Sequence, residues 1–496
     1  MLRSHKNTKL FSWLGQGGLL IVLIISALQT AMAQQGGTFT GMAAPNAAGS
    51  VATGLTETVT GQNPFQGSAS TDKLVPGTVP ITLLDAIDRG LRYNLGLYTT
   101  QVAQQTTAGA RLKALADVLP NLNARATETI QQINLATFGL SVPGFPTIVG
   151  PFAVNDLRAA VTAPVLDLSA LNKVHAATEN VQASQLNYKN ARELVVVTVG
   201  LSYVEALASE ARVDAVQAQL NTAQTLYQTA VDQKNAGVTP AIDVLRAQVE
   251  MQAQQQRLVA AKNVFDKDKL QLARIIGLPV AQQYTLAQKI PYTPAPVMTL
   301  EDAITRALRD RPDYAVAESR VRAAEFSQHA ATSERLPSLF ISGDYGVIGR
   351  NLSNSHGTFS VTGGVRVPIF EGGRIKGDIL QADSVLQQRK AEAEDMRGRI
   401  EYEVRSAFLD LTSAAELVRV AQSTLDLANQ TLVQAQDRFR AGVTNNVEVV
   451  QAQEAVANSN DAFISSTLQF NLAKLALARS LGVAERATKE FLGGTP

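Results

Sequence analysis

The sequence of 496 residues contains no cysteine. This absence excludes disulfide bonds, thiolate metal sites, cysteine nucleophiles and a lipid anchor on an N-terminal cysteine. Histidine is also scarce, and none of the four histidines has metal-ligand spacing to another histidine or an acidic residue. The sequence contains no nucleotide fingerprint, zinc signature or Gly-x-Ser-x-Gly motif. We therefore expect a protein that is not an enzyme, with no catalytic residues, no cofactor and no metal site.

Aromatic residues make up 5% of the chain, and the formal net charge is only +1. A near-neutral chain has no bulk electrostatic attraction to nucleic acid, so we expect no nucleic-acid partner. Few aromatic residues, together with abundant alanine and glutamine, favour long helices with narrow seams over one thick globular core.

Long apolar runs are rare as well, and the run Leu19–Leu28 lies near the N-terminus. Basic residues precede it, and Ala31-Met32-Ala33 follows it as a small-x-small cleavage site, so residues 1–33 are predicted to be a signal peptide. The alternative is a membrane-anchoring helix, but the run is too short to span about 30 Å of hydrocarbon. No later segment offers 18 consecutive apolar residues. A mature chain that enters a membrane would therefore do so as a β-barrel.

Residues 34–79 are rich in Gly, Ser, Thr, Asn and Ala, which is typical of a flexible leader. The rest of the chain contains an internal repeat. TLLDAIDRGLRYN from Thr82 resembles TLEDAITRALRDR from Thr299, and AGVTPAIDVLRAQ from Ala236 resembles AGVTNNVEVVQAQ from Ala441. We interpret the chain as two tandem copies of one unit, over residues 80–295 and 296–490.

Each copy is predicted to contain three helices: an opening helix, a very long helix and a last helix. Their ranges are about 82–118, 169–235 and 240–276 in the first copy, and 299–335, 373–440 and 445–481 in the second. Thr82 and Thr299 are candidate N-caps. Apolar residues repeat every seven residues along the long helices, which predicts coiled-coil packing. Because the two shorter helices together match the long one in length, we expect them to cover it end to end.

A pair of strands follows each opening helix, at about 121–133 and 153–164, and again at 338–349 and 358–368. In the last strand Phe359, Val361, Val365 and Val367 alternate with polar or small residues, which is the period of a two-faced strand. Periodicity alone leaves open an ordinary half-buried hairpin in a soluble protein. Four strands cannot close a barrel, so strands that meet lipid require several copies: two would give eight strands and three would give twelve.

These features together resemble the TolC-like outer-membrane efflux proteins over about residues 81–483. The resemblance rests on the Thr-Leu-x-x-Ala-Ile openings, on VRVPIFEGGR from Val365 with its weaker counterpart VTAPVLD from Val161, and on the paired Ala-Gly-Val-Thr turns. It implies a mainly α fold with a membrane β-barrel. Tandem-duplicated coiled-coil helices would form a trimeric α-barrel tunnel in the periplasm, and each chain would add four strands to a shared twelve-stranded barrel in the outer membrane. The implied partners are outer-membrane lipid, a periplasmic adaptor (membrane fusion) protein and an inner-membrane pump or ABC exporter.

The resemblance also assigns roles to residues near the two Ala-Gly-Val-Thr turns. An adaptor-docking tip would comprise Gly237, Val238, Thr239, Gly442, Val443 and Thr444. A periplasmic gate would comprise Asp243, Glu448 and Gln451, with Gln451 where familiar members have Asp. Phe439 replaces a tyrosine of the family's closing network and Thr444 replaces an arginine, so the resemblance implies a gate that is less charged and has fewer ionic links.

Physical reasoning supports a role for the tip without the analogy, because a ring of Glu448 carboxylates on a symmetry axis would favour cations and resist full closure. The alternative is a plain helical hairpin with solvated carboxylates. The predicted function is a passive outer-membrane channel of a tripartite efflux or type I secretion system that exports small molecules or proteins. The alternative function is an exported coiled-coil scaffold or adhesin without channel activity.

Overall fold

The computed structural model describes residues 63–69, 73–139, 144, 146–289, 293, 298–441, 443–444 and 446–486. The predicted signal peptide and most of the predicted leader lie outside these residues. The helices are α2 Leu83–Tyr93, α3 Leu95–Ala116, α4 Leu168–Asn235, α5 Ala241–Ile275, α6 Leu300–Asp310, α7 Pro312–Ser333, α8 Arg374–Arg440 and α9 Asn446–Ser480. The strands are β1 Val79–Ile81, β2 Asn121–Asn134, β3 Ile148–Leu166, β4 Tyr284–Leu286, β5 Ser338–Gly349 and β6 Ser355–Arg366. Short 3-10 helices occur at Pro64–Gln66, Leu135–Phe138 and Leu352–Asn354.

The long helices, the last helices and the four long strands begin and end within a few residues of the predicted positions, apart from an earlier start of β3. The two predicted N-caps are also confirmed. The Thr82 hydroxyl accepts a hydrogen bond from the Asp85 backbone N–H, and Thr299 does the same for Asp302. A hydroxyl at this position satisfies a donor that the first helical turn leaves unpaired.

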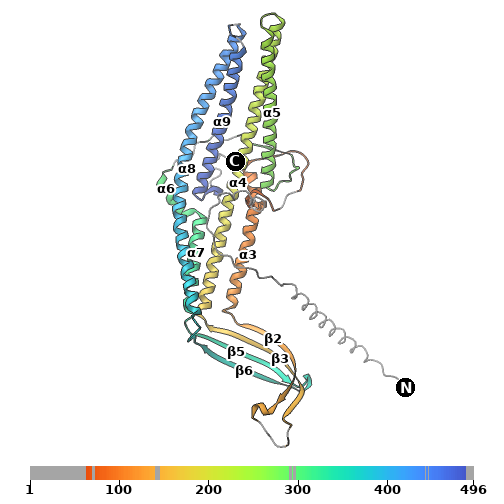
Figure 1. Ribbon diagram of the computed structural model, residues 1–496, viewed down its shortest axis with the longest axis vertical. Helices are drawn as coiled ribbons and strands as arrows, with labels where there is room; N and C mark the ends of the chain where they lie inside the picture. Colours follow the sequence, from red (N-terminus) through yellow and green to blue (C-terminus); the bar gives the residue numbers. More distant parts are fainter. Residues whose placement is uncertain are drawn as a thin grey trace, which may run out of the picture. The chain divides into compact units, whose positions relative to one another are not determined.

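The prediction of one continuous opening helix in each copy is wrong. The first is broken at Asn94, which has extended backbone and whose side chain accepts a hydrogen bond from the Gly96 N–H. The second is broken at Arg311, because the following Pro312 disfavours helical backbone at the residue before it. Each break allows a short helix to turn away from the bundle, as Figure 1 shows for α6.

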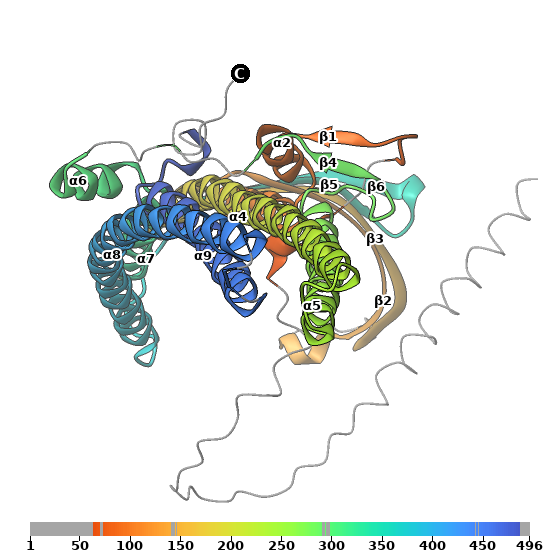
Figure 2. The ribbon, with the colours of Figure 1, turned by 90° about the horizontal axis from the view of Figure 1, so that it is seen from above.

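The two long helices are each covered by two shorter helices, as predicted. Helix α4 packs against α3 along one part of its length and against α5 along the other, and α8 packs against α7 and α9 in the same manner (Figure 1). Contacts of α4 with α7 and α9 join the two halves. Figure 2 shows the long helices side by side in a curved layer, with α8 towards one edge and α5 towards the other.

The apolar stretch of α4 lies in the core of this layer. An 18-residue window of α4 is apolar enough to cross a membrane by composition, with mean hydropathy 1.5, but 61% of it is buried inside the structure. Val195, Val196, Val199 and Tyr203 are almost fully buried there, in the main hydrophobic core. Packing against neighbouring helices accounts for the apolar character of this stretch.

Strands β2, β3, β5 and β6 form one antiparallel sheet in that order. The two predicted hairpins pair with each other through β3 and β5. Strands β1 and β4 form a second, two-stranded parallel sheet that the sequence did not reveal, since three-residue strands have no measurable periodicity.

A buried charge cluster holds the break between α6 and α7 against the bundle. The Arg311 side chain is 3% exposed, and its guanidinium lies 2.7 Å from the Asp313 carboxylate and 2.5 Å from that of Glu403 on α8. Burial alone would raise the pKa of Asp313, but the hydrogen bonds and charge of Arg311 outweigh it and hold the pKa below its usual value. The cluster therefore links three helices through one guanidinium.

We expect Arg311→Met to destabilise the fold by about 3 kcal/mol, because it leaves the largely buried Asp313 carboxylate without its main partner. The measurement is the urea midpoint of the detergent-extracted protein. Arg419→Met is the matched control, since Arg419 forms an exposed pair with Glu416 on α8 and its loss should cost at most about 1 kcal/mol. Equal midpoints for the two variants would contradict this role of Arg311.

A second buried cation, Lys474 on α9, has no carboxylate partner among the described residues. Its Nζ lies 3.0 Å from both the carbonyl and the hydroxyl oxygen of Thr293, and 5.0 Å from the centre of the Phe470 ring. Burial lowers the pKa of Lys474 to about 8. The unfolded chain, with an ordinary lysine pKa near 10.5, therefore binds more protons than the folded chain between these two values.

Stability should consequently rise with pH from about 8 towards 10.5 as the folded lysine loses its charge. We expect Lys474→Met to be more stable than the unchanged protein at pH 7, and this advantage to shrink by pH 9.5. Thermal unfolding of both proteins at a series of pH values checks this. A constant difference in unfolding temperature across the series would show that burial does not penalise the charge.

Candidate channel wall and gate

The large sheet has one apolar face. Directly paired residues share a face, so the register places one set together: Leu122, Ala124, Leu157, Ala159, Val161, Ile341, Tyr345, Val347, Phe359, Val361 and Val365. Phe359 and Val361 are 77% and 75% exposed, so no described part of the chain covers this face. The apolar stretch is interrupted at the row of Glu128, Asn155, Gly349 and Ser355. An uncovered apolar band on a sheet suits contact with lipid.

The opposite face of the sheet carries many polar residues, and the charge of Arg158 on it is paired with acidic residues of its own and the next strand. The Arg158 guanidinium bonds to Asp344 on β5, lies 3.3 Å from Asp156 and donates to the Thr358 hydroxyl on β6 at 3.2 Å. Asp344 also accepts a hydrogen bond from Ser360. A face with bonded charges and hydroxyls suits water, so this sheet separates a lipid-compatible side from a water-compatible side.

The two Ala-Gly-Val-Thr turns lie at the ends of α4 and α8 away from this sheet (Figure 1). After α4, Gly237 has a left-handed backbone with φ of 73°. The Val238 N–H donates to the Gln233 carbonyl, and the Val443 N–H donates in the same way to Arg438. These bonds close each helix tightly. Val238 and Val443 are 67% and 70% exposed, which leaves two aliphatic side chains at the tips.

The side chains of the predicted tip residues Thr239 and Thr444 are less exposed than those of Val238 and Val443. The Thr239 hydroxyl is buried and has no partner among the described residues. Thr444 is half-buried and donates a hydrogen bond to Glu448. Gly442 lies outside the described residues.

Glu448 is half-buried at the start of α9 and is held by two partners. Its carboxylate accepts the hydrogen bond of the Thr444 hydroxyl, and its other oxygen lies 3.1 Å from the Arg438 guanidinium on α8. Sequence reasoning did not identify Arg438, because nothing in the local pattern shows that the last turn of α8 faces the first turn of α9. The negative charge of Glu448 is therefore compensated within its own chain.

Asp243 is buried at the start of α5, with its carboxylate 3.4 Å from Arg246 on the same helix. Its backbone carbonyl accepts a hydrogen bond from the fully buried Asn446 side chain at 3.2 Å, which links the starts of α5 and α9. Asn446 was also missed. Gln451 is exposed and lines a groove between α5 and α9 with Ile242, Leu245 and Val450. No hydrogen bond or ion pair joins Asp243, Glu448 and Gln451 among the described residues.

Phe439 fills a small apolar cluster beside these polar groups. It is 4% exposed and packs with Leu226, Ala435, Val449 and Ala452. Three of the four helices at the tip contribute to this cluster, namely α4, α8 and α9. The contact between the helix pairs at this level is therefore apolar rather than ionic.

Comparisons with known proteins agree on one family. The family described as outer membrane efflux protein matches residues 155–278 and 303–483. The pyoverdine export outer membrane protein OpmQ of Pseudomonas putida is 22% identical over 62% of this chain and 66% of its own length. The alkaline protease secretion protein AprF of Pseudomonas aeruginosa is 22% identical over 66% of this chain and 70% of its own.

Among solved structures, the CmeC outer membrane channel of Campylobacter jejuni superposes with a TM-score of 0.71 at 15% identity, covering 91% of this chain and 97% of that one. The predicted fold, mainly helical with four antiparallel strands per chain, is thereby confirmed. The predicted TolC-like function, outer-membrane location and absence of enzyme activity agree with the matched family. The chain belongs to the outer membrane efflux protein family and is a TolC-like outer-membrane channel of efflux or type I secretion systems.

Proposed function

We propose that three copies of this chain form one passive conduit, with a shared twelve-stranded barrel in the outer membrane and a helical tunnel in the periplasm. The observation that carries this proposal is the sheet itself. Strands β3 and β5 are paired on both sides, whereas β2 and β6 are each paired on one side only among the described residues. An unpaired edge cannot remain in hydrocarbon, so further strands have to complete it.

The edges of the helical layer support the same assembly. Large apolar side chains are exposed along α8 at one edge: Leu380, Tyr402, Leu409, Leu417, Val420, Leu427 and Val433. Another set is exposed on α3 and α5: Leu112, Leu245, Val249, Val259 and Leu270. Helix α5 lies towards the other edge of the layer (Figure 2). Two different apolar edges favour head-to-tail contacts that close into a ring.

The number of copies follows from the interior width that a water-filled barrel needs. Two chains would supply eight strands, and an eight-stranded barrel is just wide enough for its interior to be filled by side chains. Three chains would supply twelve strands, whose polar faces can enclose water. Arg158, Asp344 and Ser360 would then line the aqueous interior.

The tips support docking of a partner at the periplasmic end. Gly237, Val238, Thr239, Gly442, Val443 and Thr444 would contact a periplasmic adaptor, and the exposed Val238 and Val443 offer it compact apolar contacts. The adaptor would join the channel to an inner-membrane pump or ABC exporter, which supplies the energy. Relatives include proteins of pyoverdine export and of alkaline protease secretion, so both small molecules and proteins are candidate cargo.

The proposed gate comprises Asp243, Glu448 and Gln451 at the same end. Threefold repetition would bring three Glu448 carboxylates near the axis. Each is compensated by Arg438 and bonded by Thr444, which reduces the repulsion between them. Gln451 adds no charge, and the buried Asp243 would act through its link to Asn446. Closing this gate would therefore involve little electrostatic repulsion between the three chains.

We expect the protein extracted from outer membranes in mild detergent to have the mass of a trimer by light scattering, and to conduct ions in planar bilayers. Leu409→Glu places a charge in the proposed contact between chains and should shift most of the protein to monomer. Leu409→Met keeps the position apolar and should remain trimeric. A soluble monomer or dimer would reject the barrel and favour the coiled-coil scaffold or adhesin.

Replacing Arg438 tests the gate. Arg438→Met removes the counter-charge of Glu448, so repulsion among the three carboxylates should raise the open probability several-fold and strengthen cation preference; each lost pair is worth about 0.2–1 kcal/mol. Single-channel recording and reversal potentials in a salt gradient measure both effects. The double variant with Glu448→Gln should return towards the unchanged protein.

Arg440→Met is the matched control, because Arg440 is exposed two residues further on and pairs with Asp437 rather than Glu448. If Arg438→Met and Arg440→Met behave alike, Glu448 does not set the charge at the gate.

A further inference from the structure

The internal repeat of the sequence is also present in the pairing of the strands. Helices α2 and α3 have the same lengths as α6 and α7, which lie 217 residues later, so β2 corresponds to β5 with that offset. Strand β3 corresponds to β6 with an offset of 204. These two offsets convert the β2–β3 pair Asn121↔Thr162 into Ser338↔Arg366, which is the pair observed between β5 and β6. The two hairpins therefore have the same register.

This equivalence extends to the contact between chains, and this step rests on the proposed trimer. Within one chain, β3 of the first copy pairs with β5 of the second copy. In the proposed ring, β6 of one chain meets β2 of the next chain, and these are the equivalent strands in the same order. Their directions fit, because the antiparallel order β2-β3-β5-β6 makes β6 antiparallel to β2.

The register between β3 and β5 can then be transferred to the contact between chains. The pair Val161↔Gly343 becomes Val365 of one chain opposite Ala126 of the next. Val365 and Ala126 both belong to the apolar face of the sheet, so the transferred register continues this face across the contact. A slip of one residue would place Val365 opposite a residue of the polar face.

The transferred register brings two arginines from different chains together. The pair Thr162↔Ser342 becomes Arg366 of one chain opposite Arg125 of the next. Arg125 is directly paired with Arg158 inside its own chain and therefore lies on the polar face. Arg366 lies on the same face, because its directly paired neighbour would be Arg125. Both arginines would thus face the water-filled interior of the barrel.

Neither arginine is compensated by an acidic residue of its own chain. Both are exposed, and neither forms an ion pair in the part of the chain that the structure describes. The Arg366 guanidinium lies 5.9 Å from the centre of the Phe340 ring, which leaves its charge in place. Arg158 differs, because Asp344 compensates its charge. Like charges directly opposite each other destabilise a strand pair, so this contact favours a bound negative charge.

We propose that each contact between chains binds one divalent oxyanion, of the sulfate or phosphate type, between Arg366 of one chain and Arg125 of the next. Guanidinium groups bind such anions through parallel N–H donors. Asn123 and Thr127, which flank Arg125 on the same face of β2, carry no charge that competes with the anion. Three such sites form a positive ring around the interior of the barrel, at the end of β6 that leads to α8.

Cysteine cross-linking in outer membranes tests the pairing, since the chain contains no cysteine of its own. We expect Val365→Cys combined with Ala126→Cys to give covalent trimers on oxidation, because directly paired residues lie within disulfide range. Val365→Cys combined with Ile130→Cys is the matched control, since Ile130 lies on the same face about 13 Å further along β2. If the first pair does not cross-link in a protein of trimer mass, the register is wrong and the site is lost with it.

Calorimetric titration of the detergent-extracted trimer with sodium sulfate, at constant ionic strength, tests the anion site. Methyl sulfate is the monovalent probe. We expect one saturable sulfate site per chain and weaker binding of methyl sulfate, because a single negative charge offsets only one guanidinium. Arg125→Gln and, independently, Arg366→Gln should weaken sulfate binding at least about ten-fold.

Arg350→Gln is the matched control, because Arg350 is an exposed arginine that follows the far end of β5. It should bind sulfate as the unchanged protein does. Absence of saturable sulfate binding in a protein of trimer mass, or an equal loss in Arg350→Gln, would overturn the site and leave the channel assembly intact. A monomer would reject the assembly and the site together.

Discussion

Backbone hydrogen bonding in hydrocarbon is the constraint on which this structure depends. Within a membrane every N–H and carbonyl group needs a partner inside the protein. In the part of the chain that the structure describes, β3 and β5 each have two neighbouring strands, whereas β2 and β6 each have only one. The sheet of one chain is therefore an incomplete wall, and in the proposed trimer other copies would provide the missing hydrogen bonds. In a closed barrel, the apolar face of the sheet would contact lipid and the polar face would contact water.

The helical part of the chain meets a different requirement. Helices α4 and α8 have 68 and 67 residues, or about 100 Å, and an apolar stripe of that length needs cover along all of it. Two shorter helices supply the cover for each, which places their junctions halfway along. The buried Arg311 cluster and the small β1–β4 sheet lie among these junction elements. Directional polar contacts thus fix the point along each long helix where one covering helix ends and the next begins.

Sequence patterns predicted the elements whose signals repeat over many residues. The long helices followed from seven-residue periodicity, and β6 followed from the alternation of Phe359 and Val361 with polar neighbours. The break at Arg311 could have been found from Pro312. The break at Asn94 has no such marker, because an asparagine inside an apparent helix is common. Arg438 and Asn446 were missed for another reason: each acts across two helices, and no local pattern encodes which turns face each other.

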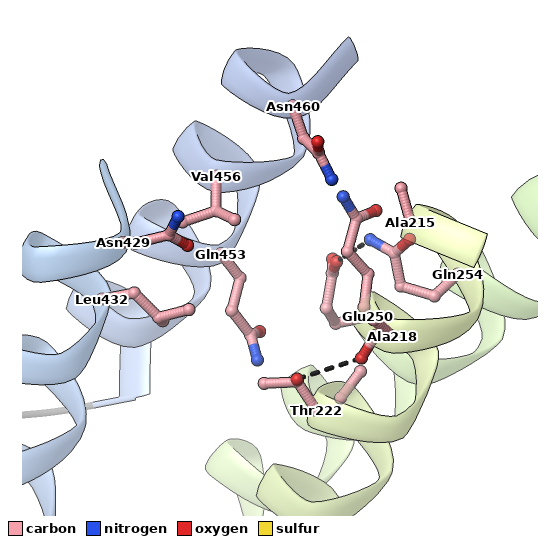
Figure 3. A pocket seen from close by; sticks show the side chains of 12 residues that line it. Ala215, Ala218, Thr222, Glu250, Gln254, Asn429, Leu432, Gln453, Val456 and Asn460 are labelled. Carbon is pink, nitrogen blue, oxygen red and sulfur yellow. Dashed lines mark hydrogen bonds between the residues drawn. The ribbon is translucent and has the colours of Figure 1, made fainter. Parts of the chain in front are cut away.

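The contact between the helix pairs changes character along its length. It is apolar in the main core, polar around a cavity of about 220 Å³ beside Gln254 and Gln453 (Figure 3), and apolar again around Phe439. Buried amide atoms of Gln254 and Gln453 that have no partner among the described residues weaken adhesion locally, whereas the Phe439 cluster restores it at the tip. The tips are thus separated from the main core by a polar layer. The proposed gate would need few ionic links at the tips, because apolar packing already joins the helix pairs there. The charge of Glu448, which is compensated within its own chain, is consistent with this proposal.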